Sequence, residues 1–170
     1  VFIYFYNIQE SLIFSPIPLE QEYNFDFKSK HIEINTETDQ KTVINSILFQ
    51  NEKSENLIFY LHGNNQNIST VETEISEYLK LNWDVLTIDY RQYGKSKGEI
   101  VSEDHLHNDV KTIYDNISKS YKPENIVIIG YSLGTGFASK LASKSKAKHT
   151  ILIAPHYNII DLIEHMCETY

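Results

Sequence analysis

The chain has few of the residues that crosslink small domains or bind metals in them. It contains one cysteine, Cys167, which has no second cysteine with which to form a disulfide inside the chain. Neither a Cys-x-x-Cys pair nor the Cys/His spacing of a zinc site occurs in the sequence. We therefore expect no internal disulfide, no metal site and no cofactor.

An excess of positive charge is also missing. The 15 Lys and Arg residues are outnumbered by 23 Asp and Glu residues, which gives a formal net charge of -8 without long runs of either sign. Domains that bind nucleic acid carry a basic patch or stripe, so this pattern argues against a nucleic-acid partner. With 41% hydrophobic and 22% charged residues over 170 positions, the composition is that of one globular domain.

A hydrophobic run long enough to span a bilayer is missing too. The apolar stretch Val1–Tyr6 is far shorter than the roughly 20 residues that a membrane-spanning helix needs. Because the sequence begins with Val1 rather than Met, residues 1–10 can be read as the end of a longer N-terminal signal or anchor helix. An edge strand or a disordered start explains the same residues, and the sequence leaves this choice open.

What the sequence does contain is an alternation of short β-branched runs and longer amphipathic stretches. From Leu57 onward this pattern is typical of parallel strands joined by crossover helices, so it predicts an α/β fold with a mostly parallel sheet. An antiparallel hairpin is predicted ahead of it, from His31–Asn35 and Thr42–Phe49. Four runs are almost continuously apolar, as strands covered on both faces must be: Leu57–Leu61, Val85–Ile88, Ile126–Ile129 and Ile151–Ile153.

Three apolar stripes at helical spacing predict helices that cover the two faces of this sheet. Ser102, followed by Glu103 and Asp104, predicts an N-cap with acidic residues in the first turn of the second helix. The stripes are Ile68, Val71, Ile75, Tyr78 and Leu79; then Leu106, Val110, Ile113, Tyr114 and Ile117; then Leu133, Phe137 and Leu141.

The segment Gly130–Gly134 has the sequence G-Y-S-L-G and matches the G-x-S-x-G pattern of a nucleophile elbow. It lies between a predicted strand and a predicted helix, which is the context that the pattern requires. The turn holds its serine in a strained conformation, so Gly130 and Gly134 supply positions without bulk on either side of Tyr131 and Ser132. We predict that Ser132 is a nucleophile and that the N-terminus of the following helix favours an oxyanion.

A second polar segment, Leu61–Asn64 with the sequence L-H-G-N, follows the first long apolar strand. In hydrolases with a nucleophile elbow, the loop at this position supplies half of the oxyanion hole. The backbone N–H groups of Asn64 and Leu133 would then converge on the developing negative charge. We expect His62 to organise this loop with Gly63, because the histidine that serves as base follows the serine in the chain.

A third polar segment, residues 89–96 with the sequence D-Y-R-Q-Y-G-K-S, follows the second apolar strand. It therefore reaches the same carboxyl edge of the sheet. We expect Asp89 and Arg91 to pair and to brace the neighbouring elbow. We expect a solvated loop here rather than a segment that takes part directly in catalysis.

Together these segments resemble the Bem46-like serine hydrolases, also described as serine aminopeptidase S33-like domains, of the α/β-hydrolase superfamily. Gln92 departs from that group's usual glycine, and Asn65 and Gln66 replace its usual small pair. These departures concern the conformation of two loops. The resemblance covers nearly the whole chain and rests on four motifs in order: Ser11–Pro16 (S-L-I-F-S-P), His62–Asn64 (H-G-N), Asp89–Gly98 (D-Y-R-Q-Y-G-K-S-K-G) and Gly130–Gly136 (G-Y-S-L-G-T-G).

The resemblance implies an α/β-hydrolase fold and hydrolysis of an ester, thioester or amide through an acyl-serine. It also implies a small-molecule or lipid-like acyl substrate, often near membranes. An N-terminal membrane anchor is common in the group, so the resemblance favours a membrane-anchored protein over a cytoplasmic one. Residues 11–170 are then expected to form an incomplete α/β-hydrolase domain.

The expected partners of Ser132 are not evident in the sequence. A serine hydroxyl needs a histidine that takes its proton and a carboxylate that orients this histidine. Asp161 and His165 would share one helical face, but a single helix does not position both groups for the serine, so we interpret them as surface residues. The alternative is a truncated, catalytically inactive hydrolase fragment whose sheet exposes an apolar edge.

Two histidines near two carboxylates raise the question of a metal site. His105 and His107 lie close to Asp104 and Asp109 in the sequence. Because residues at i and i+2 diverge on a helix, we expect a solvated helix face there instead.

A dinucleotide-binding oxidoreductase domain is a further alternative. Gly130, Gly134 and Gly136 fit the glycine-rich turn of a short-chain dehydrogenase. Such a turn normally follows the first strand of its domain, whereas this one follows the third long strand. No Tyr-x-x-x-Lys pair comes after it, so the sequence favours the hydrolase.

Overall fold

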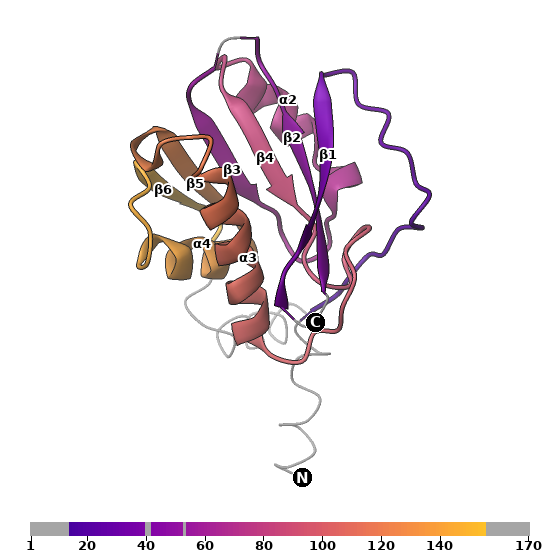
Figure 1. The fold of residues 1–170 in the computed structure, drawn as a ribbon. Helices are drawn as coiled ribbons and strands as arrows, with labels where there is room; N and C mark the ends of the chain where they lie inside the picture. The colour runs from indigo at the N-terminus through magenta and orange to yellow at the C-terminus, as the bar shows by residue number, and fades with distance from the viewer. Residues whose placement is uncertain (1–13, 40–41, 53, 156–170) are drawn as a thin grey trace.

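The computed structural model describes residues 14–39, 42–52 and 54–155. In this part of the chain, six strands form one sheet in the order β1-β2-β4-β3-β5-β6 (Figure 1). Strand β3 is parallel to β4 and to β5, and β5 is parallel to β6, so the predicted α/β fold is confirmed. The strands are β1 (His31–Glu37), β2 (Val43–Phe49), β3 (Leu57–Leu61), β4 (Asp84–Ile88), β5 (Ile126–Tyr131) and β6 (His149–Ile153).

The predicted N-terminal hairpin is also confirmed. Strands β1 and β2 pair antiparallel, with His31 opposite Phe49 and Glu37 opposite Val43. Strand β2 then pairs antiparallel with β4, which joins the hairpin to the parallel part of the sheet.

Helices cover both faces of the sheet (Figure 1). Helix α2 (Glu72–Leu79) packs on one face, and α3 (Glu103–Ile117) and α4 (Gly134–Ala142) pack on the other. The predicted cap of α3 is present, because the Ser102 hydroxyl accepts a hydrogen bond from the backbone N–H of His105 at 3.4 Å. These helices are the crossovers that parallel strands require.

One short 3-10 turn precedes helix α2 and another precedes strand β5. The first predicted helix is divided, since the turn η2 (Ile68–Thr70) comes before α2. Asn67 and Thr70 cap this turn with reciprocal side-chain hydrogen bonds to each other's backbone N–H groups. The turn η3 (Pro123–Asn125) leads into β5.

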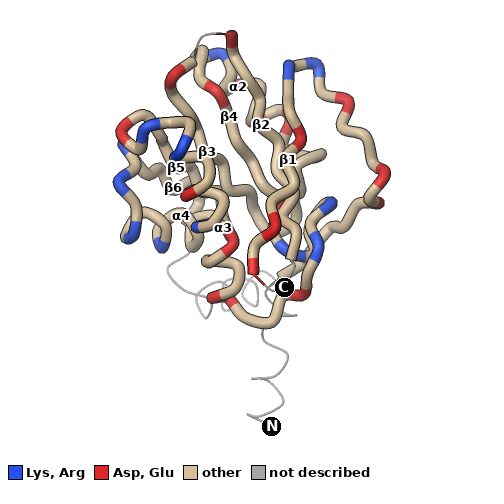
Figure 2. Tube along the Cα trace, viewed as in Figure 1, with Lys and Arg blue, Asp and Glu red and all other residues tan. Residues whose placement is uncertain are grey.

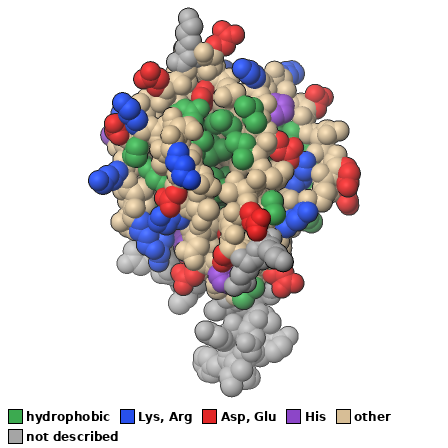
Figure 3. Space-filling model, viewed as in Figure 1, with side chains coloured by type: hydrophobic (Ala, Val, Ile, Leu, Met, Phe, Trp, Pro, Cys, Tyr) green, Lys and Arg blue, Asp and Glu red, His purple; other side chains and the backbone are tan. Residues whose placement is uncertain are grey.

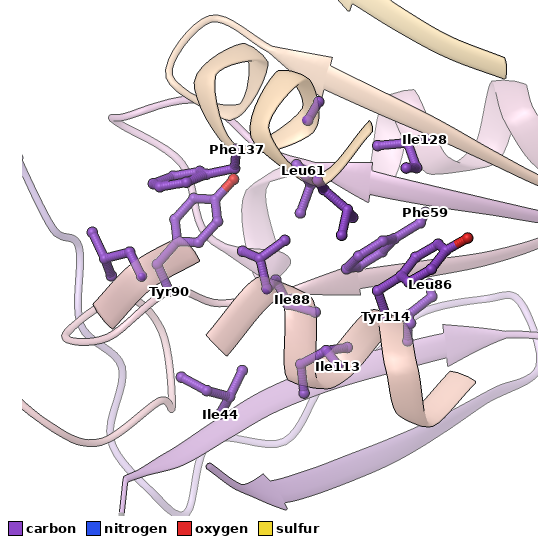
Figure 4. Packing of buried hydrophobic residues seen from close by; sticks show 14 of the residues in the cluster. Ile44, Phe59, Leu61, Leu86, Ile88, Tyr90, Ile113, Tyr114, Ile128 and Phe137 are labelled. Atoms are coloured by element: carbon purple, nitrogen blue, oxygen red, sulfur yellow. The ribbon is translucent and has the colours of Figure 1, made fainter. Parts of the chain in front are cut away.

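The core consists of two apolar layers, one on each face of the sheet. Successive residues of a strand point to opposite faces, so a strand buried on both faces must be apolar at successive positions. In β3, Ile58 and Tyr60 face α2, whereas Phe59 and Leu61 face α3 and α4. Figure 4 shows the second layer, with Phe59, Leu86, Ile128 and Tyr114 among its members.

Strand β6 differs from the other apolar strands. The prediction that it is covered on both faces is wrong, because Ile151, Leu152 and Ile153 are 46%, 42% and 37% exposed. It is the last strand of the sheet in the described residues and pairs there only with β5. In the described part of the chain, β6 therefore forms an exposed apolar edge of the sheet.

Most charged side chains lie at the surface. Lys, Arg, Asp and Glu are distributed along the whole described chain (Figure 2), and both signs occur on the visible face (Figure 3). Within the described ranges, each helix is too short or too polar to cross a bilayer. The apolar opening of the sequence lies outside the described residues.

Arg91 departs from this surface pattern, as three buried aspartates do, because its side chain is only 3% exposed. Its Nε donates to Asp109 Oδ2 at 2.6 Å and its Nη2 donates to Asp109 Oδ1 at 3.0 Å. Asp39 accepts a further bond from Nη2, and Thr38 donates to Asp109 Oδ1 at 2.6 Å. The hydrogen bonds to Asp109 are the largest cause of the raised pKa of Arg91.

These contacts correct two predictions. Arg91 pairs with Asp109 and Asp39 and not with Asp89, so the predicted Asp89–Arg91 pair is wrong. The solvated helix face expected around His105 and His107 is also wrong in part, since Asp109 is buried and the His107 ring packs against Phe137 of α4.

The buried ion pair predicts a large difference between two carboxylates of α3. Asp109→Asn removes a buried carboxylate that accepts two hydrogen bonds from Arg91, so we expect the free energy of unfolding to fall by about 3 kcal/mol. Asp115→Asn breaks an exposed pair with Lys111 and should cost less than about 0.5 kcal/mol. Urea denaturation measures both, and equal losses would contradict a buried role for Arg91.

Candidate active site

Ser132 occupies a strained turn between β5 and α4. Its φ is 49°, in the left-handed region that a residue with a side chain adopts at a cost of roughly 1–2 kcal/mol. The Ser132 N–H donates to Ile153 O at 2.9 Å, which ties the turn to β6. The Ser132 carbonyl accepts the backbone N–H and the hydroxyl of Thr135 at 2.9 and 2.6 Å. The turn is therefore held from both sides.

The glycines on either side of Ser132 lie where side chains would not fit. A Cβ at Gly130 would be 2.4 Å from Gly134 O and 2.8 Å from the Cβ of Ala138. A Cβ at Gly134 would be 2.1 Å from Leu61 O. The sequence predicted this lack of bulk, and the structure adds its consequence: α4 begins in backbone contact with the end of β3.

The first peptide unit of the β3 loop, between His62 and Gly63, is held at both of its polar groups. Its carbonyl, His62 O, accepts the Tyr90 hydroxyl at 2.9 Å. Its N–H, on Gly63, donates to Gln66 Oε1 at 2.9 Å. The orientation of this peptide unit is thus fixed by side chains from two other positions.

The next peptide unit, between Gly63 and Asn64, is oriented by His62. The carbonyl of Gly63 lies 2.8 Å from His62 Nδ1, and since a carbonyl only accepts hydrogen bonds, Nδ1 carries a proton. Because the described peptide bonds are trans, the N–H of this unit, on Asn64, points away from His62. His62 itself is fully buried.

The side chain of Asn64 anchors the loop to two other segments. Its Oδ1 accepts the backbone N–H of Ser15 at 2.8 Å and the hydroxyl of Tyr93 at 2.5 Å. Burial raises the pKa of Tyr93, so its hydroxyl stays protonated and donates. Part of the N-terminal motif, Ser15, therefore lies against the loop after β3.

Asp89 organises the loop after β4 and is itself fully buried. Its Oδ1 accepts the N–H of Ile68 at 2.8 Å, and its Oδ2 accepts the N–H of Lys95 at 3.3 Å. Oδ1 also lies 3.7 Å from His62 Nε2, which makes no hydrogen bond among the described residues. The carboxylate thus joins the loops after β3 and β4. The sequence had predicted that a pair between Asp89 and Arg91 would hold this region, whereas Asp89 holds it through backbone N–H groups.

The rings of His62, Tyr90 and Phe137 form an aromatic cluster that packs against these loops. The rings of His62 and Tyr90 are 4.4 Å apart, and those of Tyr90 and Phe137 are 4.7 Å apart. Figure 4 shows Tyr90 beside Phe137 of α4. Burial raises the pKa of Tyr90 well above its ordinary value, so the hydroxyl that holds His62 O remains a donor.

Sequence reasoning missed the part that Gln66 plays. The sequence marked it as a departure from a family pattern, and the structure puts its side chain on the N–H of Gly63. Gln92, the other departure, has a φ of 66°. Glycine adopts this conformation without strain. The glycine that is usual at this position in the resembled group could therefore have indicated the left-handed backbone from the sequence.

A base and an acid for Ser132 are not among the residues that the structure describes near the elbow. His149 begins β6 and is paired with Val127, at the opposite end of β5 from Ser132. Asp161 and His165 lie outside the described residues. Nor do residues 14–155 contain a group of three His, Cys, Asp or Glu side chains that could hold a metal ion.

Comparison with known families and proteins gives a consistent result. Residues 52–167 match the family model described as serine aminopeptidase, S33. Protein bem46 of Schizosaccharomyces pombe is 27% identical over 88% of this chain and 54% of its own length. Protein R595 of Acanthamoeba polyphaga mimivirus is 30% identical over 75% of this chain and 47% of its own length. The chain thus spans about half the length of these curated relatives.

Other similarities concern a lipase and a solved structure. The Danio rerio lysophosphatidylserine lipase ABHD12 is 33% identical over 64% of this chain and 30% of its own length. The Pyrococcus furiosus esterase Pf2001 superposes with a TM-score of 0.73 at 21% identity, over 92% of this chain and 61% of that one. The latter likeness shows a shared fold.

The contact between α4 and β3 predicts opposite effects at two glycines of the same helix. Gly134→Ala would press a methyl group against Leu61 O, so we expect the free energy of unfolding to fall by about 3 kcal/mol. Gly136 has no heavy atom within 4 Å of an added Cβ, so Gly136→Ala should raise it by about 0.5–1 kcal/mol. Urea denaturation of both variants checks the difference, and a loss at Gly136 as large as at Gly134 would refute it.

The left-handed conformation of Gln92 predicts a stabilising substitution. Gln92→Gly relieves the strain of its φ of 66°, which outweighs the added freedom of the unfolded chain, so unfolding should cost about 0.5 kcal/mol more. Gln92→Ala keeps a Cβ and should bring no such gain. Thermal or denaturant unfolding of both variants measures the effect, and stabilisation by alanine alone would be inconsistent with this explanation.

Proposed function

Because this chain belongs to the serine aminopeptidase S33 family of α/β-hydrolases, we propose that it acts as a serine hydrolase with Ser132 as its nucleophile. The observation that carries the proposal is the left-handed φ of Ser132 at a strand-to-helix turn. Strain at a residue with a side chain persists only where the surroundings impose it, and it is frequent at catalytic positions. The loop after β3 also supports this function, because it meets the start of α4 and its backbone is held by side-chain hydrogen bonds.

In this proposal, Ser132 Oγ attacks the carbonyl carbon of an ester, thioester or amide. A base takes the hydroxyl proton and passes it to the leaving alcohol, thiol or amine, and an acyl-serine remains. Water then attacks this intermediate, the same base takes its proton and returns it to Ser132 Oγ, and the acid and free Ser132 are released. We assign the base and its orienting carboxylate to residues outside 14–155.

The proposed oxyanion hole consists of the backbone N–H groups of Asn64 and Leu133. The bond from His62 to Gly63 O supports the first donor, since it turns the Asn64 N–H away from the buried side of the loop. Leu133 precedes the first turn of α4, so the partial positive charge of the helix N-terminus would add to the second donor. His62 is then a residue that orients a donor, and Gly63 permits the close approach of the Tyr131 ring.

For the substrate, we propose a small acyl compound, with acyl lipids as the class to test first. The relative from Danio rerio is named a lysophosphatidylserine lipase and is 33% identical over 115 residues. This name supports an ester of a lipid-like acid over a peptide. A membrane anchor preceding the described residues stays a prediction of the sequence.

A catalytically inactive chain is the competing function, and one observation favours it. Among the described residues, His62 lies in the loop that meets the start of α4, but its Nδ1 already holds Gly63 O and its side chain is fully buried. It is therefore unsuited to take a proton from Ser132.

Labelling with a fluorophosphonate probe distinguishes the two functions. The probe reacts with a serine whose hydroxyl is activated by a base, so the proposal predicts labelling of the unaltered chain that disappears in Ser132→Ala. A Ser139→Ala variant, which changes an exposed serine of α4, should label like the unaltered chain. Absence of labelling in all three proteins would favour the inactive chain, and labelling that survives Ser132→Ala would sink the assignment of the nucleophile.

A further inference from the structure

We propose that Gln66, held by Glu74 of α2, is a positioning residue that sets the backbone of the oxyanion loop. This inference rests on the proposed function, because it concerns the loop that would carry the Asn64 donor. Gln66 would not touch the substrate. It would act through the peptide unit between His62 and Gly63.

The geometry is a chain of two hydrogen bonds. Gly63 N–H donates to Gln66 Oε1 at 2.9 Å, and Gln66 Nε2 donates to Glu74 Oε1 at 3.2 Å. Glu74 lies in the first turn of α2, a helix that packs on the sheet through Ile75, which is 1% exposed. A rigid helix thereby reaches the backbone of the loop through one side chain.

The chemistry of the two neighbours requires an amide at position 66. A backbone N–H can only donate a hydrogen bond, and an ionised carboxylate can only accept one. The side chain between Gly63 and Glu74 must therefore accept on one side and donate on the other. Glutamine does both, and its two neighbours select the same orientation of the amide group. A glutamate in its place would accept from Gly63 but repel Glu74.

The position of Gly63 bears on both halves of the proposed site. A Cβ at Gly63 would lie 3.0 Å from Tyr131 Cδ1 and 3.1 Å from Gln66 Oε1, so Gly63 is enclosed by these two side chains. Tyr131 directly precedes Ser132, and Gly63 directly precedes Asn64. A rotation of the Gly63 backbone would thus disturb the Asn64 N–H on one side and the elbow on the other.

Gln66 completes the set of groups that hold this loop. Tyr90 holds His62 O, the His62 ring holds Gly63 O, and Gly63 N–H is left to Gln66. The first two groups are buried, whereas Gln66 is half-buried. It is therefore the anchor that lies partly in solvent, and its replacement changes the loop without removing a fully buried side chain.

A reciprocal exchange of the two side chains tests the proposal. Gln66→Glu puts two carboxylates side by side, so the side chain at position 66 no longer donates to Glu74 and the two groups repel each other. In the double variant Gln66→Glu/Glu74→Gln, the carboxylate at 66 accepts from Gly63 while the amide at 74 donates to it, so both hydrogen bonds return. Glu77→Gln is the control, since Glu77 is an exposed carboxylate of the same helix that pairs with Lys80.

Two measurements on the whole chain are compared across these variants. Amide hydrogen exchange at Gly63 should be roughly tenfold faster in Gln66→Glu and return to its original rate in the double variant. The limiting rate at which a fluorophosphonate phosphonylates Ser132, with loss of fluoride, should fall about tenfold with little change in probe affinity, and should recover likewise. Glu77→Gln should alter neither rate.

The two measurements separate this inference from the proposed function. Unchanged Gly63 exchange in Gln66→Glu, or a double variant that fails to recover, would overturn the role of Gln66. A labelling loss that appears only as weaker probe affinity would also overturn it. If the unaltered chain does not label at all, the proposed function fails, and Gly63 exchange still decides whether Gln66 and Glu74 set the loop.

Discussion

The proposed site depends on one steric constraint, the backbone contact between Gly134 and the end of β3. A Cβ at this position would meet Leu61 O at 2.1 Å and His62 O at 2.9 Å, so only glycine lets α4 begin there. The contact has two effects. It sets the N-terminus of α4 beside the loop after β3, and it leaves Ser132 in a turn too tight for ordinary backbone angles. Helix, loop and serine are therefore positioned together, before any polar group contributes.

Polar side chains then fix the orientation of the loop that this contact brings close. The carbonyl and N–H of the His62–Gly63 unit and the carbonyl of the next unit all have side-chain partners. Buried polar groups are costly when unpaired, so each of these bonds excludes other arrangements of the loop. Asp89 adds a buried carboxylate that accepts two backbone N–H groups from different loops. The donors of the proposed oxyanion hole would thus be set by the fold rather than by substrate.

Sequence and structure agree where local pattern decides the outcome and differ where partners distant in the sequence decide it. The strands, the hairpin, the Ser102 cap and the glycine turn follow from hydrophobic period, capping chemistry and lack of bulk, which are properties of neighbouring residues. The partners of Arg91 did not follow, because Asp39 and Asp109 are 52 and 18 positions away, and only the paths of the N-terminal hairpin and of α3 bring them to it. Likewise β6 is apolar enough for a buried strand, yet its exposure depends on what packs beside it.

The sequence by itself determined the fold class, the family and the identity of the candidate nucleophile, because the elbow and its glycines are a local motif in a recognisable context. Only the tertiary structure decided which groups hold the loop after β3. Gln66 and Glu74 are eight residues apart, Tyr90 and His62 are 28 apart, and Asn64 and Ser15 are 49 apart. Hydrogen bonds over such separations depend on the relative placement of whole strands and helices, and the pattern of residues along the chain does not encode their geometry directly.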